Sequence, residues 1–297
     1  MKIPKSIQAD LALVAVTFVW GSTFTIVKTS LAQISPILFV ALRFWLATIV
    51  ILPFMARQVP RISGRTFRKG LLLSLFLLGG FIFQTLGLRG TSPSNSAFIT
   101  SLSVLLVPLL GFVFFRDRPR LQTLAGIILA TMGLYLLLMN VANMEMTPGD
   151  MLTLICAILF AFQILFLGRF VATADFRHLM LLQVGGVAIF STAMVPFLED
   201  PFVVWNGRLI LYFFITAVLA TVVAFYVQAR AQQFTTANRA ALIFSLEPFF
   251  AALFAYWLLG SILTGREWIG GLLILSGVLV SEFRILPTDP DKVSSSA

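Results

Sequence analysis

Ten apolar stretches, each about as long as a bilayer is thick, dominate the chain and are separated by short polar connections. An α-helix of about 20 apolar residues crosses the roughly 30 Å hydrocarbon core of a membrane. Every backbone polar group in that core needs an internal partner, so each stretch is expected to be a helix. The pattern therefore predicts an all-α membrane protein with ten transmembrane helices, over residues 10–28, 36–55, 70–88, 96–115, 121–139, 150–168, 178–197, 208–229, 240–260 and 267–284.

The composition supports a membrane rather than water as the solvent. Of 297 residues, 59% are hydrophobic and 11% are charged, which is more apolar material than one water-soluble core can bury. The first apolar run, residues 11–27, is longer than the core of about 7–15 residues in a secretory signal peptide. We expect it to be retained as a helix.

The positive charges predict the orientation in the cell membrane. Most of the 21 Lys and Arg residues lie in connections on one side, whereas the other side carries Lys28, Arg89, Arg208 and Arg266, and Arg43 lies inside a helix. Cytoplasmic connections are enriched in Lys and Arg, so both termini are predicted to be cytoplasmic. This rule also explains the net charge of +9 without a nucleic-acid partner.

The two halves of the sequence resemble each other at a nearly constant offset. Because each half holds five helices, an odd number, the second must enter the bilayer from the opposite face. The sequence predicts two inverted-topology repeats, residues 1–147 and 148–297, with a substrate site near the midplane where they meet. The matching pairs are Asp10 and Asp150, Pro53 and Pro196, Asn95 and Asn238, Gly126 and Gly270, and Gly133 and Gly277.

Several short segments, in this order, resemble the EamA-like family of the drug/metabolite transporter superfamily. The resemblance covers nearly the whole chain and implies a ten-helix carrier that alternates access, in a family whose members mostly export amino acids and other metabolites. One departure is the absence of the Gly-Glu pair common at the ends of helices four and nine, where this chain has Phe115-Arg116-Asp117 and Gly260-Ser261. The segments are Trp20-Gly21-Ser22, Arg43-Phe44, residues 91–102, Pro108, residues 245–248 and residues 268–271.

Glu247 is the acidic residue placed well inside an apolar stretch, roughly 10–12 Å along its helix. A buried ionisable group in a membrane is costly and is by default a candidate functional residue. Pro248 follows it and removes the helical donor for the carbonyl of Phe244, which leaves a polar notch beside the carboxyl group. Glu247 could bind a proton or a cationic group of the substrate, or it could be a neutral, hydrogen-bonded structural acid.

Arg43 is the base placed inside an apolar stretch. It could pair with a substrate carboxylate, hold its helix against a neighbour, or extend its head group toward the membrane surface. We expect a structural role in preference to a substrate contact. Pro93, Pro108 and Pro248 mark expected bends that could be hinges or fixed kinks.

A carrier site needs a mostly apolar cavity with a few polar groups. Trp20 and Thr23 share one face of the first helix, and Phe160 and Gln163 occupy the equivalent positions of the sixth. The alternative role for the polar members is hydrogen bonding between helices. The candidate substrate-binding residues are Trp20, Thr23, Gln84, Ser101, Phe160, Gln163, Tyr226, Phe244 and Glu247.

These features favour a secondary transporter that exports a small amphiphilic metabolite, such as an amino acid, with protons as a possible coupling ion. No phosphate-binding loop pattern occurs, and no cofactor, metal or nucleic acid is expected. An enzyme acting on lipid would need paired carboxylates or an activated nucleophile, which one buried acid and His178 in a loop do not supply. A channel or a non-transporting assembly partner is the alternative. Small-residue stripes around Gly126 and Gly270 fit packing within a monomer or across a homodimer.

Overall fold

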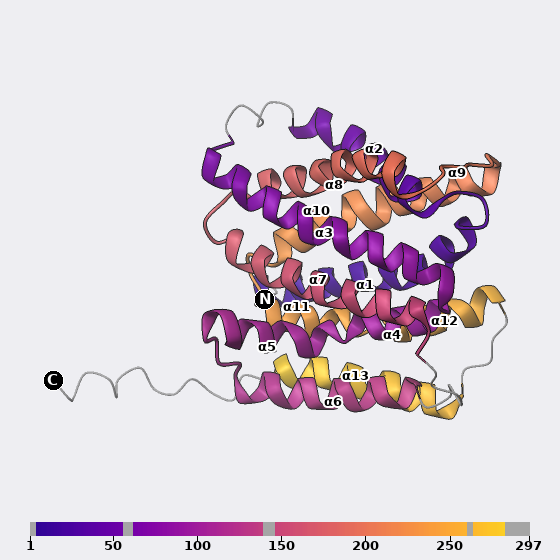
Figure 1. Cartoon of the computed structure of the whole chain (residues 1–297). Coiled ribbons are helices and arrows are strands. Elements are labelled where there is room, and N and C mark those ends of the chain that lie inside the picture. The colour runs from indigo at the N-terminus through magenta and orange to yellow at the C-terminus, as the bar shows by residue number, and fades with distance from the viewer. Residues whose placement is uncertain (1–3, 56–61, 139–145, 260–263, 283–297) are drawn as a thin grey trace, which may run out of the picture.

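The computed structural model describes residues 4–55, 62–138, 146–259 and 264–282. In these residues the helices form ten rods. Successive rods run in alternating directions and stack on one another, as Figure 1 shows. Eight rods are long and apolar enough to cross a membrane, and the other two contain shorter apolar stretches, residues 121–136 and 268–281. The chain is an integral membrane protein, and the ten predicted stretches agree with the ten rods.

The first half of the chain supplies five rods, of which the fourth is broken. Leu102 separates its two helices, and its backbone N–H bonds the carbonyl of Ile99 at 3.1 Å. The bend expected at Pro108 is not where the chain breaks, because Pro108 lies within a continuous helix. The helices are α1 (Lys5–Ser30), α2 (Pro36–Met55), α3 (Gly64–Gly90), α4 (Pro93–Ser101), α5 (Ser103–Phe115) and α6 (Leu121–Leu138).

The second half supplies the other five rods, and two of them depart from a plain α-helix. The eighth contains a π-helical stretch of nine residues. The ninth is interrupted at residues 245–246, and Pro248 stands in the first turn of its second helix, where a missing N–H is tolerated. The helices are α7 (Pro148–Phe170), α8 (Phe176–Leu198), α9 (Gly207–Phe214), η2 (Ile215–Val223), α10 (Ala224–Ala231), α11 (Ala237–Phe244), α12 (Glu247–Leu259) and α13 (Gly265–Glu282).

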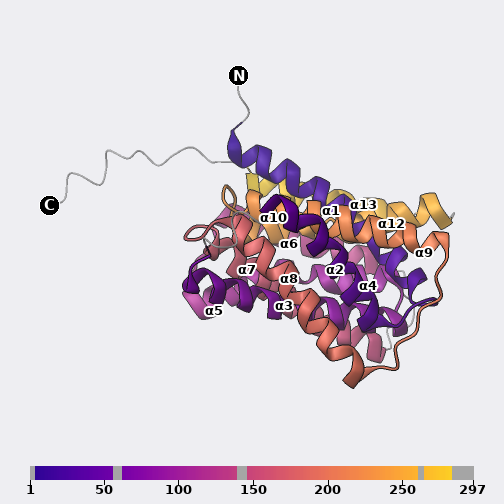
Figure 2. The same cartoon turned by 90° about the horizontal axis from the view of Figure 1, so that it is seen from above.

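Helices from the two halves pack against each other rather than within separate lobes. Helix α3 lies against α7 and α8, α2 lies against α8, and α1 lies against α12. Figure 2, seen from above, shows α1, α12 and α13 along one side of the stack. This interleaving places the central part of the molecule between helices from both halves.

Helices α6 and α13 make the closest crossing. A Cβ atom added at Gly126 would lie 2.5 Å from the carbonyl oxygen of Gly277, and one added at Gly277 would lie 2.5 Å from that of Gly126. Gly133 has the same relation to Gly270, at 2.4 Å. Only glycine permits such an approach of two backbones, which is a common device between membrane helices. The small residues therefore pack within the chain.

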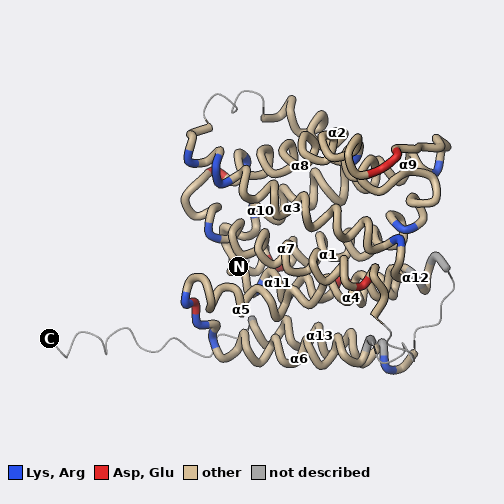
Figure 3. The backbone as a smooth tube through the Cα atoms, in the orientation of Figure 1, with Lys and Arg blue, Asp and Glu red and all other residues tan. Residues whose placement is uncertain are grey.

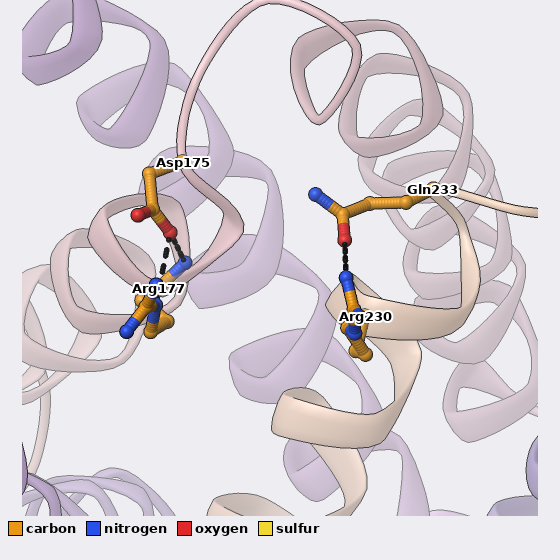
Figure 4. A network of polar contacts seen from close by, with 4 residues as sticks. All are labelled: Asp175, Arg177, Arg230 and Gln233. Atoms are coloured by element: carbon orange, nitrogen blue, oxygen red, sulfur yellow. Dashed lines mark hydrogen bonds and ion pairs between the residues drawn. The ribbon is translucent and has the colours of Figure 1, made fainter.

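Charged residues lie mainly at the two ends of the rods, as Figure 3 shows. Helix α1 begins and α13 ends at the same end of the stack, as an even number of crossings requires (Figures 1 and 2). Figure 4 shows two exposed contacts at that end: Asp175 accepts hydrogen bonds from the backbone and Nε of Arg177, and Arg230 donates to Gln233. Exposed pairs of this kind contribute little stability, so the apolar rods and their packing hold the fold.

Candidate functional site: a central cavity

A cavity lies among the rods, and residues from both halves of the chain line it. It contains about 580 Å³ of empty space, and this volume includes the space at its open mouth. Apolar rings and aliphatic side chains form most of its wall, and a few polar groups are set among them, which is the usual make-up of a small-molecule site. We call it the central cavity; its lining residues are Trp20, Thr23, Phe24, Arg43, Leu77, Phe81, Gln84, Thr100, Ser103, Phe160, Gln163, Ile164, Phe225, Gln228, Phe244 and Glu247.

Seven of the nine candidate residues from the sequence line this cavity together. Two do not. The Ser101 hydroxyl is buried and donates to the carbonyl of Ala97 at 2.9 Å within its own helix. The Tyr226 side chain is 42% exposed, and its ring packs on Phe176 with centroids 5.4 Å apart. The seven that line the cavity are Trp20, Thr23, Gln84, Phe160, Gln163, Phe244 and Glu247.

Aromatic rings from five rods form a continuous apolar wall. The Trp20 ring lies 5.1 Å from that of Phe244 and 5.5 Å from that of Phe225, measured between centroids. Phe81 lies 5.3 Å from Phe160 and 6.1 Å from Phe225. Rings at these separations attract each other beyond their burial alone. The wall therefore offers a continuous apolar surface to the apolar part of a ligand.

A chain of side-chain amides forms a polar part of the cavity. Gln228 donates from Nε2 to Oε1 of Gln163 at 3.2 Å, and Gln163 donates from Nε2 to Oε1 of Gln183 at 3.1 Å. Gln163 and Gln228 line the cavity, whereas Gln183 lies behind them and is fully buried. Oε1 of Gln228 has no hydrogen-bond partner in the described part of the chain.

Glu247 is the acidic residue of the cavity. It is the first residue of α12, directly after the break that ends α11, and 7% of its surface is exposed. In the described residues its carboxylate takes part in no hydrogen bond and no ion pair within 4.0 Å. The described residues therefore supply none of the hydrogen bonds that the alternative role, a structural acid, would need. The group is placed to meet a proton or a cation from the cavity.

Arg43 is the basic residue of the cavity and is almost fully buried, with 3% of its surface exposed. It does not extend toward the membrane surface, one of the roles considered from the sequence. Its Nε donates to the hydroxyl of Thr221 at 2.9 Å, and its Nη2 donates to the carbonyl of Ala220 at 3.3 Å. The centre of its guanidinium group lies 4.6 Å from the Phe81 ring, a cation–π distance.

The sequence of this protein matches the model of the EamA-like transporter family twice, over residues 7–139 and 147–283. The chain belongs to the EamA-like transporter family. The central cavity is thus a site within a membrane transporter, and the resemblance carried by the short segments is confirmed.

Curated relatives share this family identity over almost their full lengths. An uncharacterized transporter of Archaeoglobus fulgidus is 34% identical, with 95% of this chain and 88% of the relative covered. A probable amino-acid metabolite efflux pump of Escherichia coli is 25% identical over 96% of this chain and 98% of the relative. The corresponding efflux pump of Salmonella typhimurium is 28% identical over 92% and 94%.

A solved crystal structure has the same fold. It superimposes with a TM-score of 0.74 and covers 93% of this chain and 96% of that one, at 19% sequence identity. At this identity the likeness concerns the arrangement of helices alone.

Several residues of this transporter's cavity were missed in the sequence. Gln228 is a polar residue in an apolar stretch, the same signal that pointed to Gln163, and that signal could have found it. Phe225 and Thr100 each adjoin a residue that was chosen, Tyr226 and Ser101, so the error was one position along a helix. Phe24, Leu77, Phe81 and Ile164 are apolar residues among many and carry no distinguishing signal.

Proposed function

We propose that the chain is a secondary carrier that moves a small amphiphilic metabolite, an amino acid or a similar solute, out of the cell by alternating access. The observation that carries this proposal is the central cavity, where helices from both halves bring one acid, one base, amides and an aromatic wall together. A solute with charged and apolar parts complements that mixture. The names of the Escherichia coli and Salmonella typhimurium relatives support an amino-acid metabolite.

Two inverted repeats, residues 1–147 and 148–297, are part of the proposal. The two family-model matches each cover about one repeat. The crossing of α6 and α13 adds support, because Gly126 meets Gly277 and Gly133 meets Gly270. Gly126 corresponds to Gly270 and Gly133 to Gly277 in the sequence comparison, so exchanging the halves exchanges the two contacts. A pseudo-twofold axis in the membrane plane has this property.

Two polar contacts at opposite ends of the rods are proposed to close the cavity in turn. At one end, Asp10 of α1 pairs with Arg239 of α11. At the other end, Thr91, just before α4, donates to Asp150 of α7 at 2.5 Å. Asp10 and Asp150 correspond in the two repeats, and each joins the first rod of its repeat to the fourth rod of the other. Opening one contact while the other stays closed would expose the cavity to one side at a time.

Glu247 is proposed to bind either the ammonium group of the substrate or a coupling proton. A proton and an ammonium group compete for the same carboxylate, which would couple their movements without a second site. We place the protein in the cell membrane, with both termini and the end rich in Lys and Arg in the cytoplasm. Small-molecule substrate and lipid are its proposed partners.

Counterflow in proteoliposomes tests the carrier function. Vesicles loaded with unlabelled amino acid are diluted into labelled amino acid. A carrier then takes up label transiently above equilibrium, because it carries unlabelled amino acid outward on each return crossing. Transient accumulation that depends on the internal amino acid is the expected result. A channel would only equilibrate the label, and an assembly partner would show no uptake; either result would remove the proposal.

A further inference from the structure

We propose that Arg43, held by the π-helical stretch η2, forms a subsite of the central cavity that binds the carboxylate group of the substrate. The proposal rests on the carrier function proposed above and adds the chemical group that the carrier recognises. It assigns to Arg43 a substrate contact in place of the structural role expected from the sequence.

The first observation is that the Arg43 charge has no acidic partner in the part of the chain that the structure describes. Both of its hydrogen bonds go to neutral oxygens, those of Ala220 and Thr221. In the described residues no carboxylate lies within 4.0 Å of its guanidinium group, although Glu247 lines the same cavity. Burying an unpaired cation in a membrane protein is unfavourable in free energy. A cavity that leaves a cation unpaired is therefore suited to an anionic ligand.

The second observation explains why the chain can hold Arg43 in this way. In a π-helix each N–H bonds the carbonyl five residues back, and in an α-helix four residues back. The N–H of Ala224 bonds the carbonyls of Leu219 and Thr221, and the α-helical pattern then resumes in α10. The carbonyl of Ala220 is passed over at this change of pattern. It is therefore free to accept hydrogen bonds from side chains.

Two side chains of the cavity use that free carbonyl. Trp20 donates to it from Nε1 at 2.9 Å, and Arg43 donates to it from Nη2 at 3.3 Å. One oxygen of η2 thus joins α1 and α2 at the cavity wall. Extra turns of this type are frequent at functional sites in helices.

Thr221 fixes the direction of the guanidinium group. Its hydroxyl donates to the carbonyl of Thr216 at 2.8 Å, which leaves a lone pair to accept from Nε of Arg43 at 2.9 Å. With Nε and one Nη2 hydrogen engaged, the remaining N–H groups of Arg43 have no partner in the described chain. A guanidinium group with one edge anchored and the rest facing a cavity can bind a carboxylate through two parallel hydrogen bonds. Thr221 is a positioning residue in this arrangement.

The other charges favour a carboxylate over a phosphate. Both anions bind arginine, but the cavity holds one base and also carries Glu247. A doubly charged phosphate would keep an unneutralised charge near that acid, whereas a carboxylate matches Arg43 alone. The aromatic wall next to Arg43 then receives the apolar part of the same molecule.

The test compares acids with their amides on purified protein. L-Phenylalanine and L-leucine keep the carboxylate, and L-phenylalaninamide and L-leucinamide lack it; thermal stabilisation in detergent gives the apparent affinity. At least one acid should bind wild type tenfold or more tightly than its amide, and R43Q should abolish that preference. R89Q removes an exposed arginine outside the cavity and should leave the preference unchanged.

Variants of Thr221 separate positioning from folding, since R43Q itself could be unstable. T221V keeps the size but loses the acceptor, and it should weaken acid binding about tenfold while leaving amide binding unchanged; T221S should behave as wild type. The subsite is overturned if no acid stabilises wild type better than its amide, or if R43Q and T221V weaken both classes equally. Binding that depends on Arg43 without counterflow would instead remove the carrier function and leave the subsite in place.

Discussion

Asp10 and Arg239 form an ion pair with 2.5 Å between Oδ2 and Nη2, although 229 residues separate them in the chain. The pair ties α1 to α11 and is largely shielded, with side-chain exposures of 9% for Asp10 and 21% for Arg239. A charged hydrogen bond of this kind contributes more than an exposed one because water competes less for its partners. The contact is one of two that we propose to open in turn during transport.

Replacing Asp10 by Asn should therefore loosen this end of the molecule. We expect D10N to lower the free energy of unfolding by about 1–3 kcal/mol, the usual cost of removing one member of a charged hydrogen bond. Thermal unfolding in detergent measures the change. In a double-mutant cycle, D10N and R239Q should together cost less than the sum of the two single changes; additive effects would show that the pair is not coupled.

The amide chain allows a matched pair of substitutions. Q163L should leave Gln228 and Gln183 without their partners and destabilise the protein by about 1–3 kcal/mol. Q183L removes the end of the chain that lies behind the cavity, and it should cost stability without raising KM for the transported amino acid. Q163L should also raise KM, because Gln163 lines the cavity. An equal rise of KM in Q183L would show that the amides act on packing alone.

Glu247 lacks a hydrogen-bond or ion-pair partner among the described residues, so its replacement should affect transport more than folding. E247Q keeps the shape of the side chain and removes its charge. We expect counterflow of a zwitterionic amino acid to fall at least tenfold while the melting temperature stays level or rises, because an unpaired buried charge is removed. Measuring uptake against external pH separates the two proposed roles: a proton-binding role requires E247Q to lose any pH dependence seen in wild type.

The crossing of α6 and α13 should tolerate no side chain at its contact points. G126V and G133V place methyl groups against backbone on the partner helix and should destabilise the protein by about 1–3 kcal/mol, as overpacked sites do. Gly64 is the matched control, since an added Cβ there meets nothing within 4 Å. G64A should leave the melting temperature within about 1–2 °C of wild type. An equal loss in G64A would show that the effect does not come from the crossing.

Hydropathy alone located the rods because length and apolar composition decide whether a segment can span a bilayer. It could not place every side chain around the rods. Tyr226 was chosen where Phe225 lines the cavity, and the π-helical stretch just before them adds a residue to the turn and shifts the helix face. Ser101 was chosen where Thr100 and Ser103 line the cavity, next to the break at Leu102. A propensity-based reading of the sequence shows neither irregularity.

Arg43 illustrates a second limit. From the sequence it is one arginine near a helix end, for which extension toward the surface costs least. Its burial depends on a carbonyl oxygen that becomes free 177 residues later in the chain, where the π-helical stretch meets α10. Trp20 and Glu247, in contrast, were found because a large aromatic residue and an isolated acid stand out in an apolar helix without knowledge of its neighbours.

The proposed transport depends most on one cavity that opens to each side of the membrane in turn. The direct measurement is the reactivity of T23C, in a C156A background, toward a membrane-impermeant thiol reagent applied to either face of oriented vesicles. We expect labelling from both faces, slowed by bound substrate, with D10N favouring access from the end that carries Asp10. Labelling from one face only, unchanged by substrate and by D10N, would contradict alternating access through this cavity.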